Sequence, residues 1–495
     1  MAVIWSLLLC KAWWFFFGGI GLIYAKFQYP YLTSLGLKAN QVGTMAAISS
    51  ITAAVMSPLA GALADKTQRR RAIMILLLSA FIAVASGLPW TGAKLSLVSI
   101  QHNCTNANAS LSIADAINRS MVHSSEVLAP TSDPCMPANA STSTLFYAMM
   151  VMFVSLTSFL LPNHGLFQSI TLNIIANTPS HTQGIGSQMM FFPIGAGTWN
   201  FLTGLVADNV RFDNMSGYMV VFLMVPVLAL PLLPLTFIIF KYTRWKNTSN
   251  DINIANDTEE TLQLEQERNK GVEESEKLNE IPVEQNITRV QMLKTVLKKP
   301  STLLLLATYL LNGFLLSIMN SFSFLLMKDE MNASKTSMGL SSLVQCASMT
   351  VVYSLTDRII PILGGPIPTI EVALFLQIVR VVGMSLVRNP WLMVLPMLVN
   401  GAEPMCTVSM MRYMHARTPT QIHSTMFTLL SCLQFALGPC LSHIIGGRVY
   451  EAYGGRAMYR GAGAVAGTWI LILVLYFHVV SMVRKRMSPV KDEVL

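Results

Sequence analysis

The sequence predicts an all-α membrane protein with about twelve transmembrane helices in two six-helix halves. Of its 495 residues, 53% are hydrophobic and only 12% are charged, and the mean hydropathy is +0.51. Many apolar stretches reach the roughly 20 residues that a helix needs to cross a bilayer. These stretches lack the alternation of polar and apolar residues that a transmembrane β-barrel requires, so helices must satisfy the backbone.

One short turn sets the orientation of the first six spans. We place these spans at residues 9–33, 41–63, 72–90, 144–172, 187–207 and 217–240. The turn between the second and third spans holds four cations, Lys66, Arg69, Arg70 and Arg71. Lysine and arginine beside helix ends resist translocation, so this turn is predicted to face the cytoplasm. Because the number of spans is even, both termini are predicted to be cytoplasmic as well.

The polar stretch after the third span, residues 91–142, is then predicted to lie on the outer side. It contains four acceptor sequences for N-linked glycosylation, at Asn103, Asn108, Asn118 and Asn139. Cys104 and Cys135 bracket this loop and could form a disulfide in the secretory pathway, although sequence alone does not establish the pairing. The plasma membrane is the predicted location, with an internal membrane as the alternative.

A polar, acidic segment over residues 241–300 separates the two halves. Its low hydrophobicity and high charge predict a disordered cytoplasmic linker. The second set of spans is predicted at residues 301–327, 335–357, 367–387, 391–411, 423–445 and 458–482. The chain therefore divides into a half over residues 1–240, the linker, a half over residues 301–483 and a cytoplasmic tail over residues 484–495, as expected of a transporter built from two repeats.

Composition and motifs exclude several classes of function. The net charge of +9 comes mostly from cations at helix ends, where membrane orientation explains them, so nucleic-acid binding is not indicated. The cysteines do not have the spacing of a metal site. The sequence contains no nucleotide-binding loop and no pairing of a nucleophile with a base. We therefore expect no cofactor, no metal and no enzymatic activity, and any transport would be driven by gradients.

A short motif resembles a known family. Residues 61–70 read G-A-L-A-D-K-T-Q-R-R, similar to the loop G-x-x-x-D-(R/K)-x-G-R-R of the major facilitator superfamily, with Gln68 in place of its second glycine. The resemblance implies the major facilitator fold. It also implies a conformational latch between the two halves on the cytoplasmic side, here made by Gly61, Asp65, Lys66, Arg69 and Arg70. The alternative is that these charges only set the orientation.

A longer resemblance is more specific. Residues 389–461 contain N-P-W-L-M-V-L-P-M-L-V-N-G, R-Y-M-H-A-R-T-P and G-G-R-V-Y-E-A-Y-G-G-R-A-M-Y-R, and residues 30–43 read P-Y-L-T-S-L-G-L-K-A-N-Q-V-G. These segments resemble the group called major facilitator superfamily domain-containing protein 6, which is related to sugar and nucleoside proton symporters. The chain departs from this group at Gln168, Ser187 and Met349, where the relatives tend to carry ionisable residues.

Two ionisable residues inside predicted spans are the leading candidates for function. A charge at the centre of a membrane helix costs about 2.5–3.5 kcal/mol, so each one needs a reason. Lys26 lies in the first span and Glu403 in the tenth, and in this superfamily both spans line the central cavity. We hypothesise that they form a charge pair that substrate or a proton breaks and remakes. The alternatives are that Lys26 extends to the outer interface and that Glu403 is a buried structural carboxyl. Arg380, in the peripheral ninth span, is expected to be structural or to extend to the interface.

Uncharged polar residues complete the candidate site. His164 and Gln168 are four residues apart in the fourth span and therefore share a helix face, although packing is the alternative role for the histidine. Asn312, Asn320 and Asn400 in the seventh and tenth spans could bind hydroxyl or amide groups of a solute.

The resemblance implies a secondary transporter that moves a small polar solute by alternating access, with protons as the candidate coupling ion. Its implied partners are the lipid bilayer, the solute and protons. The alternative function is a glycosylated cell-surface receptor or adhesion protein on a transporter scaffold, with an extracellular protein ligand bound by residues 91–142. Replacing Glu403 should abolish transport but spare a receptor, whereas deleting the outer loop should do the reverse.

Overall fold

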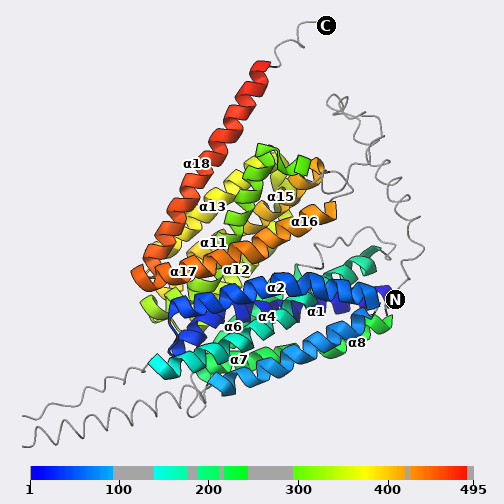
Figure 1. The fold of residues 1–495 in the computed structure, drawn as a ribbon, viewed down its shortest axis with the longest axis vertical. Coiled ribbons are helices and arrows are strands. Elements are labelled where there is room, and N and C mark those ends of the chain that lie inside the picture. The colour runs from blue at the N-terminus through cyan, green and yellow to red at the C-terminus, as the bar shows by residue number, and fades with distance from the viewer. Residues whose placement is uncertain are drawn as a thin grey trace, which may run out of the picture.

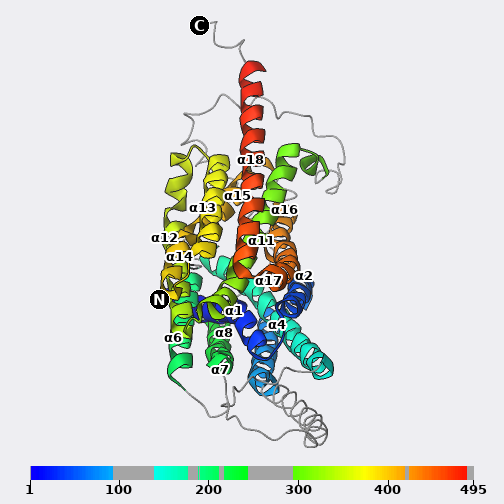
Figure 2. The ribbon, with the colours of Figure 1, turned by 90° about the vertical axis from the view of Figure 1, so that its left-hand side faces the viewer.

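The chain folds into two bundles of long helices. The computed structural model describes residues 2–67, 69–92, 139–176, 188, 190–210, 217–242, 294–418 and 423–487. The helices before residue 243 form one bundle, and those after residue 293 form the other (Figures 1 and 2). The predicted linker lies almost entirely outside the described residues, so its disorder stays a prediction.

The first half contains the helices expected from the apolar stretches. They are α1 (Ala2–Ser34), α2 (Ala39–Thr67), a helix over residues 70–92, α4 (Asn139–Ala176), α6 (Phe191–Asn209), α7 (Gly217–Ala229) and α8 (Leu232–Tyr242). The predicted sixth span is thus divided into α7 and α8 by a turn at residues 230–231. Pro231 and Pro234 lack the N–H groups that would continue the helical hydrogen bonds through this turn, which accounts for the break.

The helices of the second half also follow the order of the predicted spans, and two of these spans are irregular. Its elements are α11 (Pro300–Met331), α12 (Lys335–Ile362), α13 (Pro366–Leu386), η2 (Pro390–Met393), α14 (Val394–Leu398), η3 (Val399–Gly401), α15 (Ala402–Arg417), α16 (His423–Cys432), η5 (Leu433–Leu437), α17 (Gly438–Tyr453) and α18 (Gly455–Met487). The tenth span is broken by the 3₁₀ turns η2 and η3, and the eleventh contains the π-helical turn η5. Both interruptions lie beside polar side chains.

Eleven helices of the described part are long and apolar enough to cross a membrane. The expected fifth span, α6, is not among them, because small and polar residues such as Gly197, Asn200 and Gly204 fill its buried face. The predicted eleventh span, residues 423–445, corresponds to the candidate span Leu429–Tyr453, because the helix continues to Tyr453 before Gly454 ends it with a φ of 81°. Helix α18 also continues four residues into the predicted tail, to Met487.

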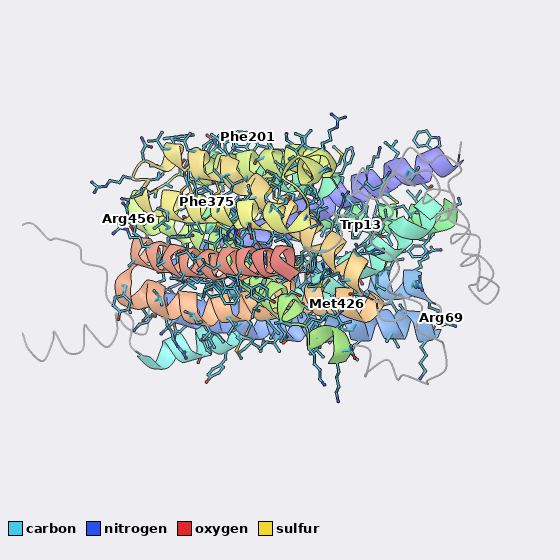
Figure 3. All side chains as sticks on the ribbon, turned by 90° about the horizontal axis from the view of Figure 1, so that it is seen from above. Trp13, Arg69, Phe201, Phe375, Met426 and Arg456 are labelled. Carbon is cyan, nitrogen blue, oxygen red and sulfur yellow. The ribbon has the colours of Figure 1, made fainter. Side chains whose placement is uncertain are left out.

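Much of the outer surface of both bundles is apolar, as a lipid environment requires. Side chains such as Ile51, Val55 and Leu471 are at least half exposed. Phe375 of α13, labelled in Figure 3, is 58% exposed. A water-soluble protein would not expose so many large apolar side chains on its long helices.

Glycines allow the two halves to pack closely. The main contacts between the halves are made by α6 with α12 and by α2 with α17. A Cβ added at Gly204 of α6 would lie 2.2 Å from the backbone oxygen of Lys335, and one at Gly43 of α2 would lie 2.3 Å from that of His443. Small residues are the usual means by which membrane helices bring their backbones together.

The two halves meet at one end of the molecule and diverge towards the other (Figure 1). We call the first end, which holds residues 34–39, 208–210, 331–335 and 453–456, the closed end, and the opposite end, which holds residues 67, 69 and 70, the far end. Figure 3 shows Arg456 at the closed end and Arg69 at the far end. At the far end Lys66 and Arg69 are exposed, and a Cβ added at Gly61 would meet no atom within 4 Å.

Packing within the first half can be tested at Gly195 of α6. A Cβ added there would lie 1.8 Å from the backbone oxygen of Phe15, so alanine must push α1 and α6 apart. We expect Gly195→Ala to lower the free energy of unfolding by about 1–3 kcal/mol. Gly467→Ala in α18 is the matched control, because its new Cβ would have no neighbour within 4 Å. Thermal unfolding of the two purified proteins in detergent would test this, and equal unfolding temperatures would contradict the packing argument.

Candidate functional site

Lys26 lies at the interface of three helices from both halves. Its side chain is 0% exposed, and its ammonium donates a hydrogen bond to Oε1 of Gln345 over 2.5 Å. The ammonium also lies 4.9 Å from the ring centre of Phe324. Gln345 in turn donates to Oδ1 of Asn320 over 3.0 Å. These hydrogen bonds join the first, seventh and eighth spans. Because the ammonium is buried among them, the alternative that Lys26 extends to the membrane–water interface is wrong.

Arg380 and Glu403 form the other charged part of the site. Arg380 of α13 is only 1% exposed, and its guanidinium donates to Oδ1 of Asn400 and lies 3.4 Å from the sulfur of Met397. Glu403, in the first turn of α15, is half-buried and interacts electrostatically with Arg380. Of the two roles expected for Arg380, extension to the membrane–water interface is wrong, because its guanidinium is buried against the tenth span.

The predicted direct pair between Lys26 and Glu403 is not formed in this structure. Among the described residues the ammonium bonds Gln345 instead, and the charge that acts on Glu403 is that of Arg380. Lys26 and Arg380 nevertheless interact electrostatically with each other, and the thiol of Cys346 interacts with all three charges. We call Lys26, Arg380 and Glu403 the buried charge cluster.

The break in the tenth span positions Asn400 and Glu403. Pro404 has no N–H group, so the carbonyl of Asn400 one turn earlier loses its helical partner and the backbone tightens into η3. Ser348 of α12 compensates: its hydroxyl donates to the carbonyl of Leu398 over 2.5 Å and accepts from the N–H of Gly401 over 3.1 Å. Irregular backbone of this kind inside a membrane protein is tolerated where protein or a cavity covers it.

Two further groups of polar contacts connect helices within the second half. Asn312 accepts a hydrogen bond of 2.6 Å from Nε2 of Gln377. Tyr309 donates to Oε1 of Gln434, whose Nε2 donates to the hydroxyl of Thr407 over 3.2 Å. The sequence prediction named Asn312 but missed its partner Gln377 and the three residues of the other group, although glutamines within apolar stretches were a visible signal.

His164 and Gln168 lie in the first half without a contact to the buried charge cluster. The His164 ring packs edge-on against aromatic rings, with its centre 5.2 Å from that of Trp14 and 6.2 Å from that of Phe192. Gln168, one turn further along α4, is half-buried. The packing alternative thus describes the histidine in this structure, and a role of either residue in solute binding stays a prediction.

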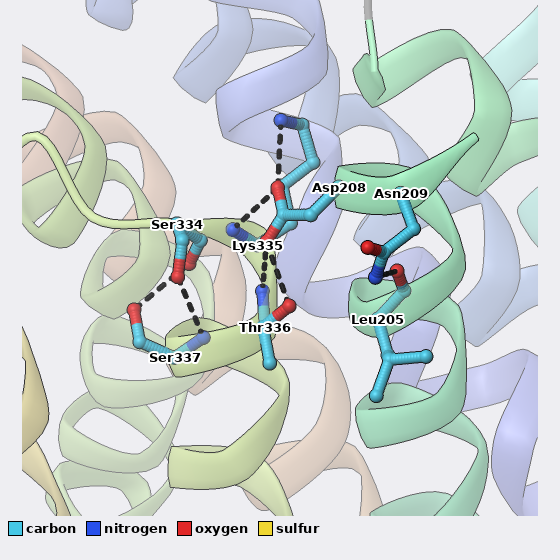
Figure 4. Close-up of polar contacts among 7 residues, drawn as sticks. All are labelled: Leu205, Asp208, Asn209, Ser334, Lys335, Thr336 and Ser337. Atoms are coloured by element: carbon cyan, nitrogen blue, oxygen red, sulfur yellow. Dashed lines mark hydrogen bonds and ion pairs between the residues drawn. The ribbon is translucent and has the colours of Figure 1, made fainter. Parts of the chain in front are cut away.

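An acidic residue bridges the halves at the closed end. Asp208, at the end of α6, accepts hydrogen bonds from the N–H groups of Lys335 and Thr336, over 3.2 and 2.7 Å, at the start of α12 (Figure 4). It also accepts from the Thr336 hydroxyl over 2.7 Å and forms an ion pair of 3.2 Å with the Lys335 ammonium. One carboxylate therefore holds the first turn of a helix in the other half, where the helix dipole also favours it.

Further contacts between the halves lie near the same end. Lys328 of α11 donates to the carbonyl of Pro30 over 3.2 Å and to the hydroxyl of Thr33 over 2.7 Å. Tyr29 and Nδ1 of His443 are hydrogen-bonded over 3.1 Å. The N–H of Asn40 donates to Glu451 over 3.2 Å. Together with Asp208, these residues form the closed-end contacts.

Several predicted sites stay untested. Lys66 and Arg69 are exposed and make no contact with the described residues of the second half, and the side chain of Asp65 is not described. The latch, with Gly61 and the half-buried Arg70, therefore stays a prediction. Asn103, Asn108, Asn118, Cys104 and Cys135 lie outside the described residues. Asn139 begins α4, but its side chain is not described.

Two bundles of membrane-spanning helices with a polar interface between them have the architecture of multi-pass membrane transporters. The chain matches the model of the MFS_1 like family over residues 5–461 and therefore belongs to that family. This confirms the resemblance to the major facilitator superfamily and makes the chain a transporter-family protein rather than an enzyme. No curated protein matches the chain.

Solved structures support the same fold. A mutant of the nucleoside transporter NupG has a TM-score of 0.63 at 15% identity, covering 96% of this chain and 99% of its own. A D-xylose–proton symporter has a TM-score of 0.58 at 12% identity, covering 94% and 97%. The inward open xylose transporter XylE from E. coli also has a TM-score of 0.58, at 11% identity, covering 95% and 96%.

The bond between Lys26 and Gln345 can be tested by a double-mutant cycle. Gln345→Leu removes the acceptor from a fully buried ammonium, so we expect the free energy of unfolding to fall by about 2 kcal/mol or more. Adding Lys26→Met removes the unpaired charge and should restore most of the loss. Thermal unfolding of the purified variants measures both effects. A double variant less stable than Gln345→Leu alone would show that the ammonium does not depend on this glutamine.

Proposed function

We propose that this protein is a secondary transporter that moves a small polar solute by alternating access. The observation that carries the proposal is the asymmetry of the interface: polar contacts join the two halves at the closed end, whereas the halves diverge towards the far end (Figure 1). Hydrogen bonds and ion pairs of this kind can exchange between two arrangements, which a permanently packed interface cannot.

The distribution of cations suggests which way the protein faces. Cations flank the far ends of the helices at Lys66, Arg69, Lys241 and Arg417, so the positive-inside rule places the far end in the cytoplasm. The structure then corresponds to an inward-facing state, with the closed end on the outside. Opening to the outside requires Asp208 to release α12 and Lys328 to release α1.

Within this cycle, Glu403 is our candidate for the proton-coupling group. Its carboxylate is half-buried and accepts no hydrogen bond from a described residue, so a proton could reach it. Protonation would remove its attraction to Arg380, freeing the guanidinium for other partners. Proton binding and the arrangement of the site would thereby be linked.

Locking the closed end should stop transport. Asp208 and Thr336 are in contact through their side chains, so Asp208→Cys with Thr336→Cys should form a disulfide on oxidation that holds the halves together. Cells that express the double-cysteine variant and are treated with an oxidant should lose the metabolite changes that the wild-type chain causes. A reductant should restore these changes. Asp208→Cys alone is the control for the lost carboxylate. Continued transport by the cross-linked variant would contradict alternating access at this interface.

Proton coupling can be tested by comparing Glu403→Gln with Glu371→Gln, which changes a half-buried acid at the start of α13 outside the cluster. Untargeted metabolite profiles would be measured in cells expressing each protein at matched surface levels. We expect one solute to accumulate in cells expressing the wild type or Glu371→Gln. In cells expressing Glu403→Gln, the same solute should only reach equal concentrations inside and outside. Equal accumulation in all three would reject the coupling role. No change with any of them would favour the receptor function.

A further inference from the structure

The fully buried charges of the described residues are both positive. Lys26 and Arg380 are 0% and 1% exposed, and they interact electrostatically with each other. Glu403 supplies one negative charge beside Arg380. The buried charge cluster therefore has an excess of one positive charge when its groups carry their ordinary charges. An uncompensated charge in a membrane interior is costly, and such residues typically mark a substrate path.

The fully buried cations of the cluster and the neighbouring Asn400 have unused donors, whereas the unused acceptors of the cluster are the carboxylate oxygens of the half-buried Glu403. The Lys26 ammonium has three donor hydrogens and makes one hydrogen bond among the described residues. Nε of Arg380 and Nδ2 of Asn400 are buried without a partner. Unpartnered donors beside an excess positive charge fit a ligand rich in acceptor oxygens, and they fit a neutral polyol less well because its hydroxyl groups leave the charge uncompensated.

The bond that occupies Lys26 must break during the transport cycle. It joins α1 in the first half to α12 in the second, and Lys26 lies eight residues before the closed end of α1. Separation of the halves at that end removes the oxygen of Gln345 from the ammonium. The ammonium then needs another acceptor, which a solute entering from that side can provide.

We propose that the transported solute is a small organic monoanion, a carboxylate in its simplest form, bound by Lys26 and Arg380 with Asn400 as an additional donor. This inference rests on the proposed transport function and adds the class of substrate. The anion neutralises the excess charge of the cluster and takes the place of Oε1 of Gln345 on the ammonium.

The test measures the untargeted metabolite profiles of cells expressing the wild-type chain, Lys26→Gln, Arg380→Gln or Arg388→Gln at matched surface levels. Arg388→Gln is the matched control, because it removes an exposed cation between α13 and η2. We expect the wild type and this control to change the level of a carboxylate. Lys26→Gln and Arg380→Gln should reduce its transport by about tenfold or more.

A second variant guards against misfolding. Lys26→Gln combined with Gln345→Lys exchanges the two partners across the interface and keeps both the charge and the hydrogen bond. It should regain transport lost by Lys26→Gln. A neutral or cationic solute moved by the wild type would overturn the proposal while leaving transport intact. An anion moved equally well by Lys26→Gln and Arg380→Gln would overturn the binding site. No transported solute at all would reject the proposed function and this inference with it.

Discussion

The burial of two cations between membrane helices is the constraint on which the interface depends. A lysine or arginine in this environment requires acceptors, and the chain provides neutral ones: Gln345 for Lys26 and Asn400 for Arg380. Those amides come from the eighth and tenth spans, so satisfying the cations fixes how these helices face α1 and α13. Glycines such as Gly204 and Gly43 then let the halves come close enough for the contacts to form.

The closed-end contacts and the hydrogen bonding of the buried charge cluster are linked through α12. Asp208 holds the start of α12, and Gln345 lies ten residues along the same helix. Because α12 is a continuous helix through this region, a displacement of its first turn also moves Gln345 relative to Lys26. The eighth span therefore connects the state of the closed end to the hydrogen bonding of the cluster, without a separate pathway through other side chains.

The periodic, apolar parts of the fold could be predicted from the sequence, but the partners within the site could not. The span length of a bilayer gave most helix positions within a few residues. It also located α6, predicted at residues 187–207, although small and polar residues build the buried face of that helix, and it missed the turn that divides α7 from α8. Lys26 and Glu403 could be identified because charges are rare in membrane helices. That Lys26 bonds Gln345 depends on how the two halves pack, which no local pattern contains.

The charge of the cluster also explains how a proton and an anion would cooperate. The cluster by itself has one excess positive charge, and protonation of Glu403 alone would raise this to two. An anion bound first removes the excess, so that a later proton restores only one positive charge. Each ligand therefore favours the binding of the other, and linkage requires the effect to be reciprocal. Coupling in this scheme needs no direct contact between Lys26 and Glu403, because Arg380 interacts with both.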